Sequence, residues 1–228
     1  MNDEEKDFAD YAKEVIRENE KFLKEKARES FGEVIGLVND AIDYVVFVTK
    51  RKDTKEYTTL SMVPFIYHIL MPFSYGISID LLVGNLPACF YELRVMLESL
   101  AKCYVADLHP NKDLFFEEKL LSLDVVLKNE EISISKLLKD FGKMVELNGR
   151  PLKIWSKISE EWLHSRIIEK VVDKIVEKSE VPPYGLALPM NYTEDDLEDI
   201  EELGKTTSEF RKILRVTMNK YKERMGSL

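Results

Sequence analysis

The chain has 228 residues, of which 45% are hydrophobic and 33% are charged, so it can bury a sizeable core and is not a disordered protein. Its net charge is −9, with 33 basic and 42 acidic side chains, which argues against a broad nucleic-acid-binding surface. Only 9 glycines and 8 prolines argue against a turn-rich β-sandwich.

Lys and Glu dominate the polar residues, and the chain contains no Gln and only 3 His. Such a composition is typical of hyperthermophile proteins, although an A+T-rich genome would also favour Lys. The acidic start lacks the apolar stretch of a signal peptide. We therefore expect a cytoplasmic protein of a thermophilic archaeon.

Apolar residues from Phe8 to Val45 recur mostly at three- and four-residue steps, which predicts a long N-terminal helix that bends or divides near Gly32 or Gly36. A stripe of this length is more than a small domain can readily cover. A twofold dimer is the commonest solution for a self-complementary apolar surface. We therefore predict a homodimer in which residues Phe8–Phe31 contribute to the interface.

Residues 50–59 are expected to form a polar loop, after which Ser61 is a candidate N-cap. The run Tyr57–Ile79 carries no charged side chain and is long enough to span a membrane. Its prolines and polar residues favour instead a central helix of a soluble bundle, kinked at Pro72, so no membrane association is expected.

Residues 86–108 form the most apolar predicted helix, which should lie at the centre and end before Pro110. Cys89 and Cys103 lie fourteen residues apart in it, or about 21 Å along a helix, which is beyond disulfide reach. Both are expected to be buried thiols, although a bond between two copies of the chain stays open.

Amphipathic periodicity predicts further helices over residues 113–129, 132–147 and 152–178. Thr193 caps the last one, with Asp196 completing a variant of the capping box. The prediction is an all-α fold: a single-domain bundle of about seven helices. It divides into an N-terminal helical arm (1–50), a central bundle (60–178) and a C-terminal helix (193–225).

Familiar catalytic motifs are absent: the sequence has no GxxxxGK[ST], GxGxxG, CxxC, HExxH or GxSxG. The three histidines, His68, His109 and His164, fall on different predicted segments. We expect no metal and no cofactor.

Arg94 and Glu98 are the strongest candidate site residues, because they stand one helical turn apart in the most apolar helix. A charge buried there needs a partner, since desolvating it alone costs several kcal/mol. Two interpretations stay open. The favoured one is a buried ion pair that orients helices, and the other is a polar pocket in the core.

Trp155 and Ser159 stand four residues apart in a later helix, and His164 follows them. Together with Arg94 and Glu98, this pattern resembles a group of prokaryotic helical proteins related to the HEPN superfamily, whose members are tied to nucleotide binding and RNA cleavage. The resemblance covers about residues 60–166. It implies a site built from Arg94, Glu98, Ser159 and His164.

The chain departs from the catalytic members of that superfamily, which carry an Arg followed four to six residues later by a His in the same helix. No Arg here has a His at that spacing. The leading hypothesis is therefore a helical protein that acts by association, as a homodimer or as a subunit of a complex. The alternative is a HEPN-like RNA-cleaving or nucleotide-binding protein with a core pocket at Arg94, Glu98 and His164, although the acidic balance offers RNA no obvious surface.

Overall fold

The computed structural model describes residues 7–50, 54–162 and 189–226. These ranges contain no strand, so the predicted all-α fold is confirmed. They hold nine helices if Met62–Leu82 counts as one, and the predicted number of about seven is roughly right. In chain order they are α1 (Phe8–Lys26), α2 (Arg28–Thr49), α3 (Thr54–Thr59), α4 (Met62–Phe65), a π-helical turn η1 (Ile66–Leu70), α5 (Met71–Leu82), α6 (Leu86–Ala106), α7 (Phe116–Asn129), α8 (Ile134–Met144), α9 (Arg150–Trp162), a 3-10 turn η2 (Glu194–Asp196) and α11 (Leu197–Gly226).

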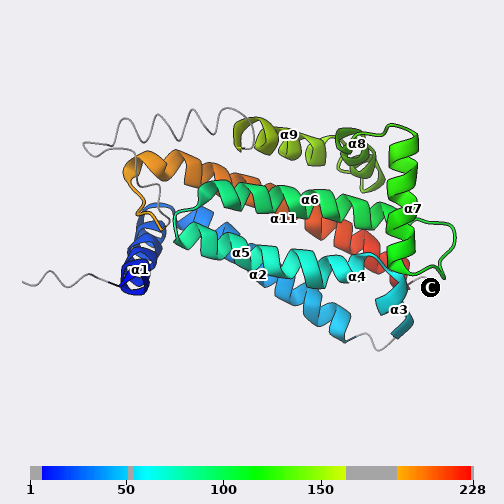
Figure 1. Ribbon diagram of the computed structural model, residues 1–228, viewed down its shortest axis with the longest axis horizontal. Coiled ribbons are helices and arrows are strands. Elements are labelled where there is room, and N and C mark those ends of the chain that lie inside the picture. The colour runs from blue at the N-terminus through cyan, green and yellow to red at the C-terminus, as the bar shows by residue number, and fades with distance from the viewer. Residues whose placement is uncertain (1–6, 51–53, 163–188, 227–228) are drawn as a thin grey trace, which may run out of the picture.

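Helices α2, α5, α6 and α11 run side by side at the centre of the molecule (Figure 1). Each contacts the next in a closed ring: α2 with α5, α5 with α6, α6 with α11, and α11 with α2. Their facing sides supply the apolar core, including Leu37, Ile77, Leu97, Phe210 and Leu214. Helix α6 also packs against α7, α8 and α9 outside the ring, as its apolar residues on several sides predict.

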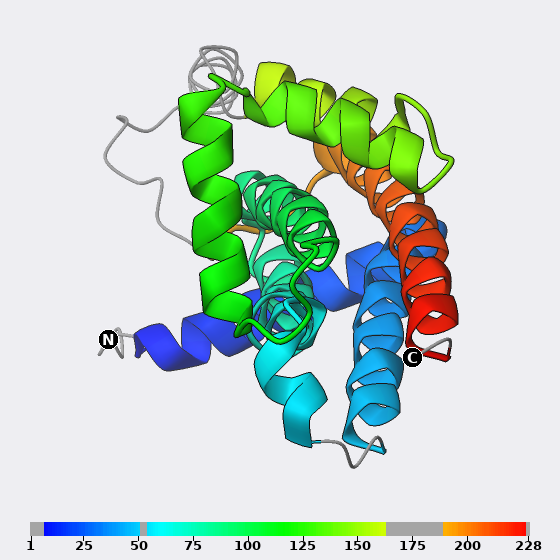
Figure 2. The same cartoon turned by 90° about the vertical axis from the view of Figure 1, so that its right-hand side faces the viewer.

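Two helices close the ends of this four-helix ring. Helix α1 lies across one end and contacts α2 and α5, and α7 lies across the other end against α6 (Figures 1 and 2). Helices α8 and α9 cover the outer side of α6, and α9 also contacts α11.

The N-terminal arm divides into two helices, but the predicted position of the break is wrong. The chain turns at Ala27, where φ is −131° and ψ is 38°, whereas Gly32 and Gly36 both lie inside the continuous helix α2. Gly36 does not bend the helix. It lets the Arg211 guanidinium group pack against the α2 backbone, where a Cβ atom would clash with it. The second helix of the arm belongs to the central ring.

Part of the N-terminal apolar stripe is buried within the chain itself. Val15, Leu23 and Ala27 are buried, whereas Phe8 and Tyr11 at the start of α1 are exposed. The turn at Ala27 makes this burial possible, because it lays α1 across the end of the ring. The described chain thus covers part of the Phe8–Phe31 surface for which a dimer interface is predicted, and it leaves Phe8 and Tyr11 exposed.

The kink predicted at Pro72 takes the form of the π-helical turn η1, in which the Met71 N–H bonds to the Ile66 carbonyl. Proline has no N–H and its ring crowds the carbonyl four residues earlier, so a wider turn just before it relieves the clash. The whole segment Met62–Leu82 is one helix long and apolar enough to cross a membrane by length and composition. The segment lies in the central ring, where its Ile66, Leu70 and Ile77 side chains are buried in the core.

The segment before this helix differs from the prediction, because α3 occupies part of the expected polar loop. Ser61 does not cap α4 with its side chain. Instead, the partly buried carboxylate of Asp107 accepts hydrogen bonds from the backbone N–H groups of Ser61 (2.6 Å) and Met62 (3.0 Å). Burial raises the pKa of Asp107, although these bonds oppose the shift.

Lys119 of α7 is buried next to this cap, with a relative exposure of 1%. Its ammonium group donates to the carbonyl oxygens of Thr59 (2.6 Å) and Lys112 (3.4 Å). Burial lowers the pKa of Lys119, and the charge of Asp107 opposes that shift. The lysine therefore joins α7 to the end of α3.

Asn19 of α1 is a buried polar hub, with a relative exposure of 1%. Its amide nitrogen donates to the carbonyl oxygens of Leu82 (2.9 Å) and Met190 (2.8 Å), and its amide oxygen accepts from the backbone N–H of Tyr192 (2.9 Å). One side chain thus joins α1, the end of α5 and the segment that leads into α11.

Several local predictions are confirmed. Helices α7 and α8 occupy the predicted ranges, Thr193 and Asp196 form a capping box, and Cys89 and Cys103 are buried free thiols. Of the predicted helix 152–178, the structure describes α9 as far as Trp162, and residues 163–178 lie outside the described residues.

Candidate functional site

The side chains of Arg94, Glu98 and Trp155 meet between α6 and α9. Arg94 Nε donates to Glu98 Oε1 at 2.8 Å, and the indole Nε1 of Trp155 donates to the same oxygen at 2.5 Å. The guanidinium carbon of Arg94 lies 4.9 Å from the centre of the Trp155 ring, in a cation–π arrangement. Three of the five residues that the HEPN resemblance singles out therefore form one cluster.

The ion pair is partly rather than fully buried, since the Arg94 side chain is 25% exposed and the Glu98 side chain 28%. Leu93 and Leu97, each one residue earlier, face the core. Each residue of a helix turns by about 100° relative to the one before it. The pair therefore lies on the flank of α6, where α9 covers it only in part.

Ser159 is buried, and its hydroxyl donates to the backbone carbonyl of Trp155 at 2.7 Å, one turn earlier in the same helix. His164, the remaining candidate, lies outside the described residues. Within the described part of the chain, the Arg94–Glu98 ion pair and the Trp155 indole hold α9 against α6, whereas the Ser159 hydroxyl bonds only within α9.

A second ionisable cluster, which the sequence patterns do not predict, lies on the opposite flank of α6. Burial, and then the charge of Asp80, raise the pKa of Glu92 to about 8. Burial also raises the pKa of Asp80, whereas a hydrogen bond from Asn85 (3.0 Å) lowers it. The one available signal is Glu92 itself, a second acid in the most apolar helix.

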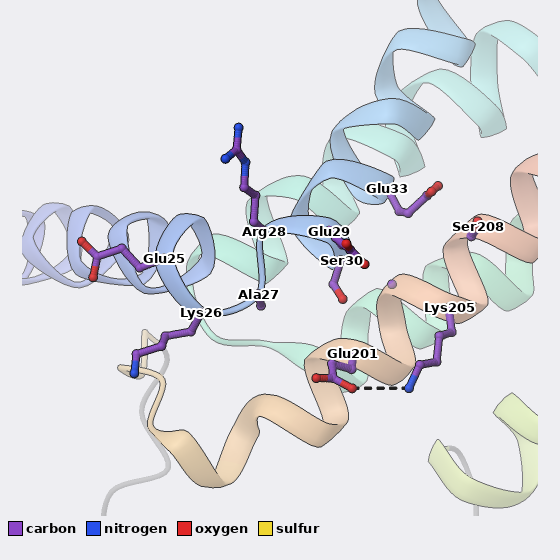
Figure 3. A pocket seen from close by; sticks show the side chains of 11 residues that line it. Glu25, Lys26, Ala27, Arg28, Glu29, Ser30, Glu33, Glu201, Lys205 and Ser208 are labelled. Atoms are coloured by element: carbon purple, nitrogen blue, oxygen red, sulfur yellow. Dashed lines mark hydrogen bonds and ion pairs between the residues drawn. The ribbon is translucent and has the colours of Figure 1, made fainter.

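A surface pocket of about 530 Å³ opens where α1 turns into α2 and faces α11 (Figure 3). Its walls carry both signs of charge, and Glu201 and Lys205 on α11 pair with each other at 3.4 Å. Gly204 lies between them in sequence and brings α11 close to Ser30. None of the predicted site residues lines this pocket.

The two described histidines do not lie together. His68 is exposed on η1, and His109 lies in the loop after α6, where its ring nitrogen accepts a hydrogen bond from the Asn111 N–H at 3.2 Å. Among the described residues, no three His, Cys, Asp or Glu side chains are placed to hold a metal ion.

Comparisons with known proteins add no relative: no family model, no curated protein and no solved structure matches the chain.

Proposed function

We propose that this chain is a soluble cytoplasmic protein that acts by association, as a subunit of a protein complex. The observation that carries the proposal is the outer face of the helix Met62–Leu82. Pro72, Tyr75 and Ile79 are exposed there, and Ile79 has a relative exposure of 58%. Their three- and four-residue spacing places them on one side of the helix.

The run Tyr57–Ile79 contains no Asp, Glu, Lys or Arg, and the exposed imidazole of His68 stands one turn before Pro72. Exposed apolar side chains that share one side of a helix favour a protein–protein contact, whereas single exposed apolar residues are common everywhere. The chemistry fits an apolar, uncharged face of a partner protein, because a charged partner group would lose its hydration there without gaining a counter-charge.

The test compares the native mass of the chain in an extract of its source cells with that of the purified recombinant chain. We expect the chain in the extract to migrate in a larger assembly. Ile79→Glu should release it from that assembly, and Glu160→Lys, a charge change on exposed α9, should not. Equal migration of the extracted and purified chains would refute the proposal. So would binding of the purified chain to lipid vesicles through Ile79, which would make the face a membrane contact.

A second candidate function is favoured by the meeting of Arg94, Glu98 and Trp155. In this alternative the chain is a HEPN-like protein that binds RNA or nucleotide at the cluster, with Arg94 facing a phosphate. Arg94 uses Nε for Glu98, and the described chain shows no bond from its other guanidinium nitrogens. Titration with ATP and with single-stranded RNA at high temperature tests it. Binding that Arg94→Ala abolishes in a still folded protein is expected, and no binding of either probe would refute it.

A further inference from the structure

Helix α7 carries an exposed stripe on the side turned away from α6. Leu121 and Val125 are 66% and 56% exposed, and they stand one turn apart. Glu117 precedes Leu121 by one turn and Lys128 follows Val125 by three residues, and both charged side chains are exposed. At 3.6 residues per turn, these four positions fall within about 80° of the helix surface.

The charged side chains at the two ends of the stripe form no ion pair in the described part of the chain. In the ranges that the structure describes, the side chains of Glu117 and Lys128 make no hydrogen bond and no ion pair. Asp124, one turn before Lys128, pairs with Lys102 at 3.1 Å. The helix therefore presents an acid, two apolar side chains and a base in a row. It lies at the end of the bundle, as Figure 2 shows.

This row is complementary to itself when it is reversed. The row is centred on residues 122–123. This point lies midway between Glu117 and Lys128, and also midway between Leu121 and Val125. An antiparallel second α7 would therefore set Glu117 against Lys128 of the other copy, and Leu121 against Val125, on both sides of one twofold axis. A parallel copy would set like charges against each other.

We propose that α7 is a homodimerisation face, on which the α7 of a second copy packs antiparallel through this row. The inference rests on the proposed function, because it names one partner of a protein that acts by association, on a surface separate from the Met62–Leu82 face. The net charge of −9 makes two copies of the chain repel each other. A dimer contact is therefore favoured where opposite charges of the two copies meet.

The contact is small. A standard protein–protein interface buries about 800 Å² of surface on each partner, and one helix face buries less than that. The dimer therefore dissociates on dilution, and its end pairs weaken as the salt concentration rises. Two identical ion pairs form at once, so changing either charge alters both pairs.

Charge exchange tests the geometry by analytical ultracentrifugation of the full chain at low salt. Glu117→Lys alone and Lys128→Glu alone should each raise the dissociation constant about tenfold or more, because each sets like charges together. The double variant should restore the dimer, since the two charges merely exchange places. The matched control exchanges two exposed charges of α9, Lys153→Glu with Glu160→Lys, and should leave the dissociation constant unchanged.

Cross-linking gives an independent readout. Leu121→Cys with Val125→Cys should yield a disulfide-linked dimer on mild oxidation. Leu121→Asp should sediment as a monomer and show the circular dichroism spectrum of a folded helical protein. A wild-type chain that stays monomeric at all concentrations would overturn the inference, as would a double charge variant no tighter than the single ones. Either result leaves the proposed function standing if Ile79→Glu still releases the chain from its assembly, and both ideas fail if it does not.

Discussion

The carboxyl group of Glu92 on α6 packs directly over Gly76 on α5, where a Cβ atom would clash with Glu92 Oε1. The other oxygen, Oε2, is buried and has no hydrogen-bond partner in the described part of the chain. Gly76 thus lets an acid settle between two core helices, and the resulting burial is the main reason that the pKa of Glu92 rises to about 8.

Stability should consequently fall as the pH rises from about 4.5 to about 8, the ordinary and the folded-state pKa of Glu92. In this window the unfolded chain has lost the proton that the folded chain keeps, so raising the pH favours unfolding. The side chain is only half buried, so after allowance for screening we expect a loss of about 1–2 kcal/mol. Urea unfolding at a series of pH values measures it.

Glu92→Gln, which keeps the shape of the protonated acid, should remove this contribution to the pH dependence. Gly76→Ala should reduce it, because the added methyl group pushes the carboxyl group outward, where it ionises more easily. Wild-type and Glu92→Gln profiles that run parallel from pH 4.5 to 8 would show that Glu92 titrates normally.

The two glycines of α2 should respond oppositely to alanine. A Cβ atom at Gly32 would have no other atom within 4 Å, so Gly32→Ala should stabilise by about 0.5–1 kcal/mol through helix propensity. At Gly36 the methyl group would displace the Arg211 guanidinium from Glu33 (2.6 Å) and Asp40 (2.7 Å). Gly36→Ala should therefore be less stable than Gly32→Ala by about 1–2 kcal/mol in thermal or urea unfolding. Equal gains for both would mean that Arg211 moves aside freely.

Arg94→Ala should destabilise by about 1–2 kcal/mol, less than the about 3–5 kcal/mol of a sealed pair, because water reaches both charges. Trp155→Phe separates the contributions, since it keeps an aromatic ring under Arg94 and removes only the indole N–H that Glu98 accepts. Urea midpoints of both variants and of their double variant give the coupling. Strictly additive effects would contradict the shared cluster.

Lys119→Met should cost about 1–3 kcal/mol although it replaces a buried charge with an apolar side chain of similar length, because the Thr59 carbonyl then lacks its donor at 2.6 Å. The positive charge that acts on the partly buried Asp107 is lost as well. The control is Lys136→Met at an exposed position of α8, which should change the free energy of unfolding little. A Lys119→Met protein more stable than the wild type would show that burying the ammonium outweighs its bonds.

The sequence predicts the features that depend on neighbouring residues and misses those that depend on distant ones. The ranges of α7 and α8 and the Thr193 cap follow from periodicity and capping chemistry within a few residues. The break at Ala27 does not, because α1 turns there to cover the end of the bundle. Asp107 caps a helix that starts 45 residues earlier, beyond any local signal.

The candidate site divides in the same way. Periodicity places Arg94 and Glu98 on one helix, but it does not show that α9 covers only part of them. Trp155 enters through the HEPN resemblance, and its indole does meet Glu98. Local patterns do not single out Glu92, because its pKa depends on a glycine and an aspartate of another helix.

Asn19 also bears on the order in which the chain can fold. Its partners at Leu82 and Met190 lie 63 and 171 residues further along the chain. During synthesis from the N-terminus, α1 is therefore made long before Met190, whose carbonyl oxygen accepts a hydrogen bond from the Asn19 side-chain amide. Contacts between such distant segments are slow to form, since closing long loops costs entropy first. The docking of α1 is thereby tied to the arrival of the C-terminal segment, so a nascent chain that lacks residues 189–226 would hold α1 with its amide only partly bonded.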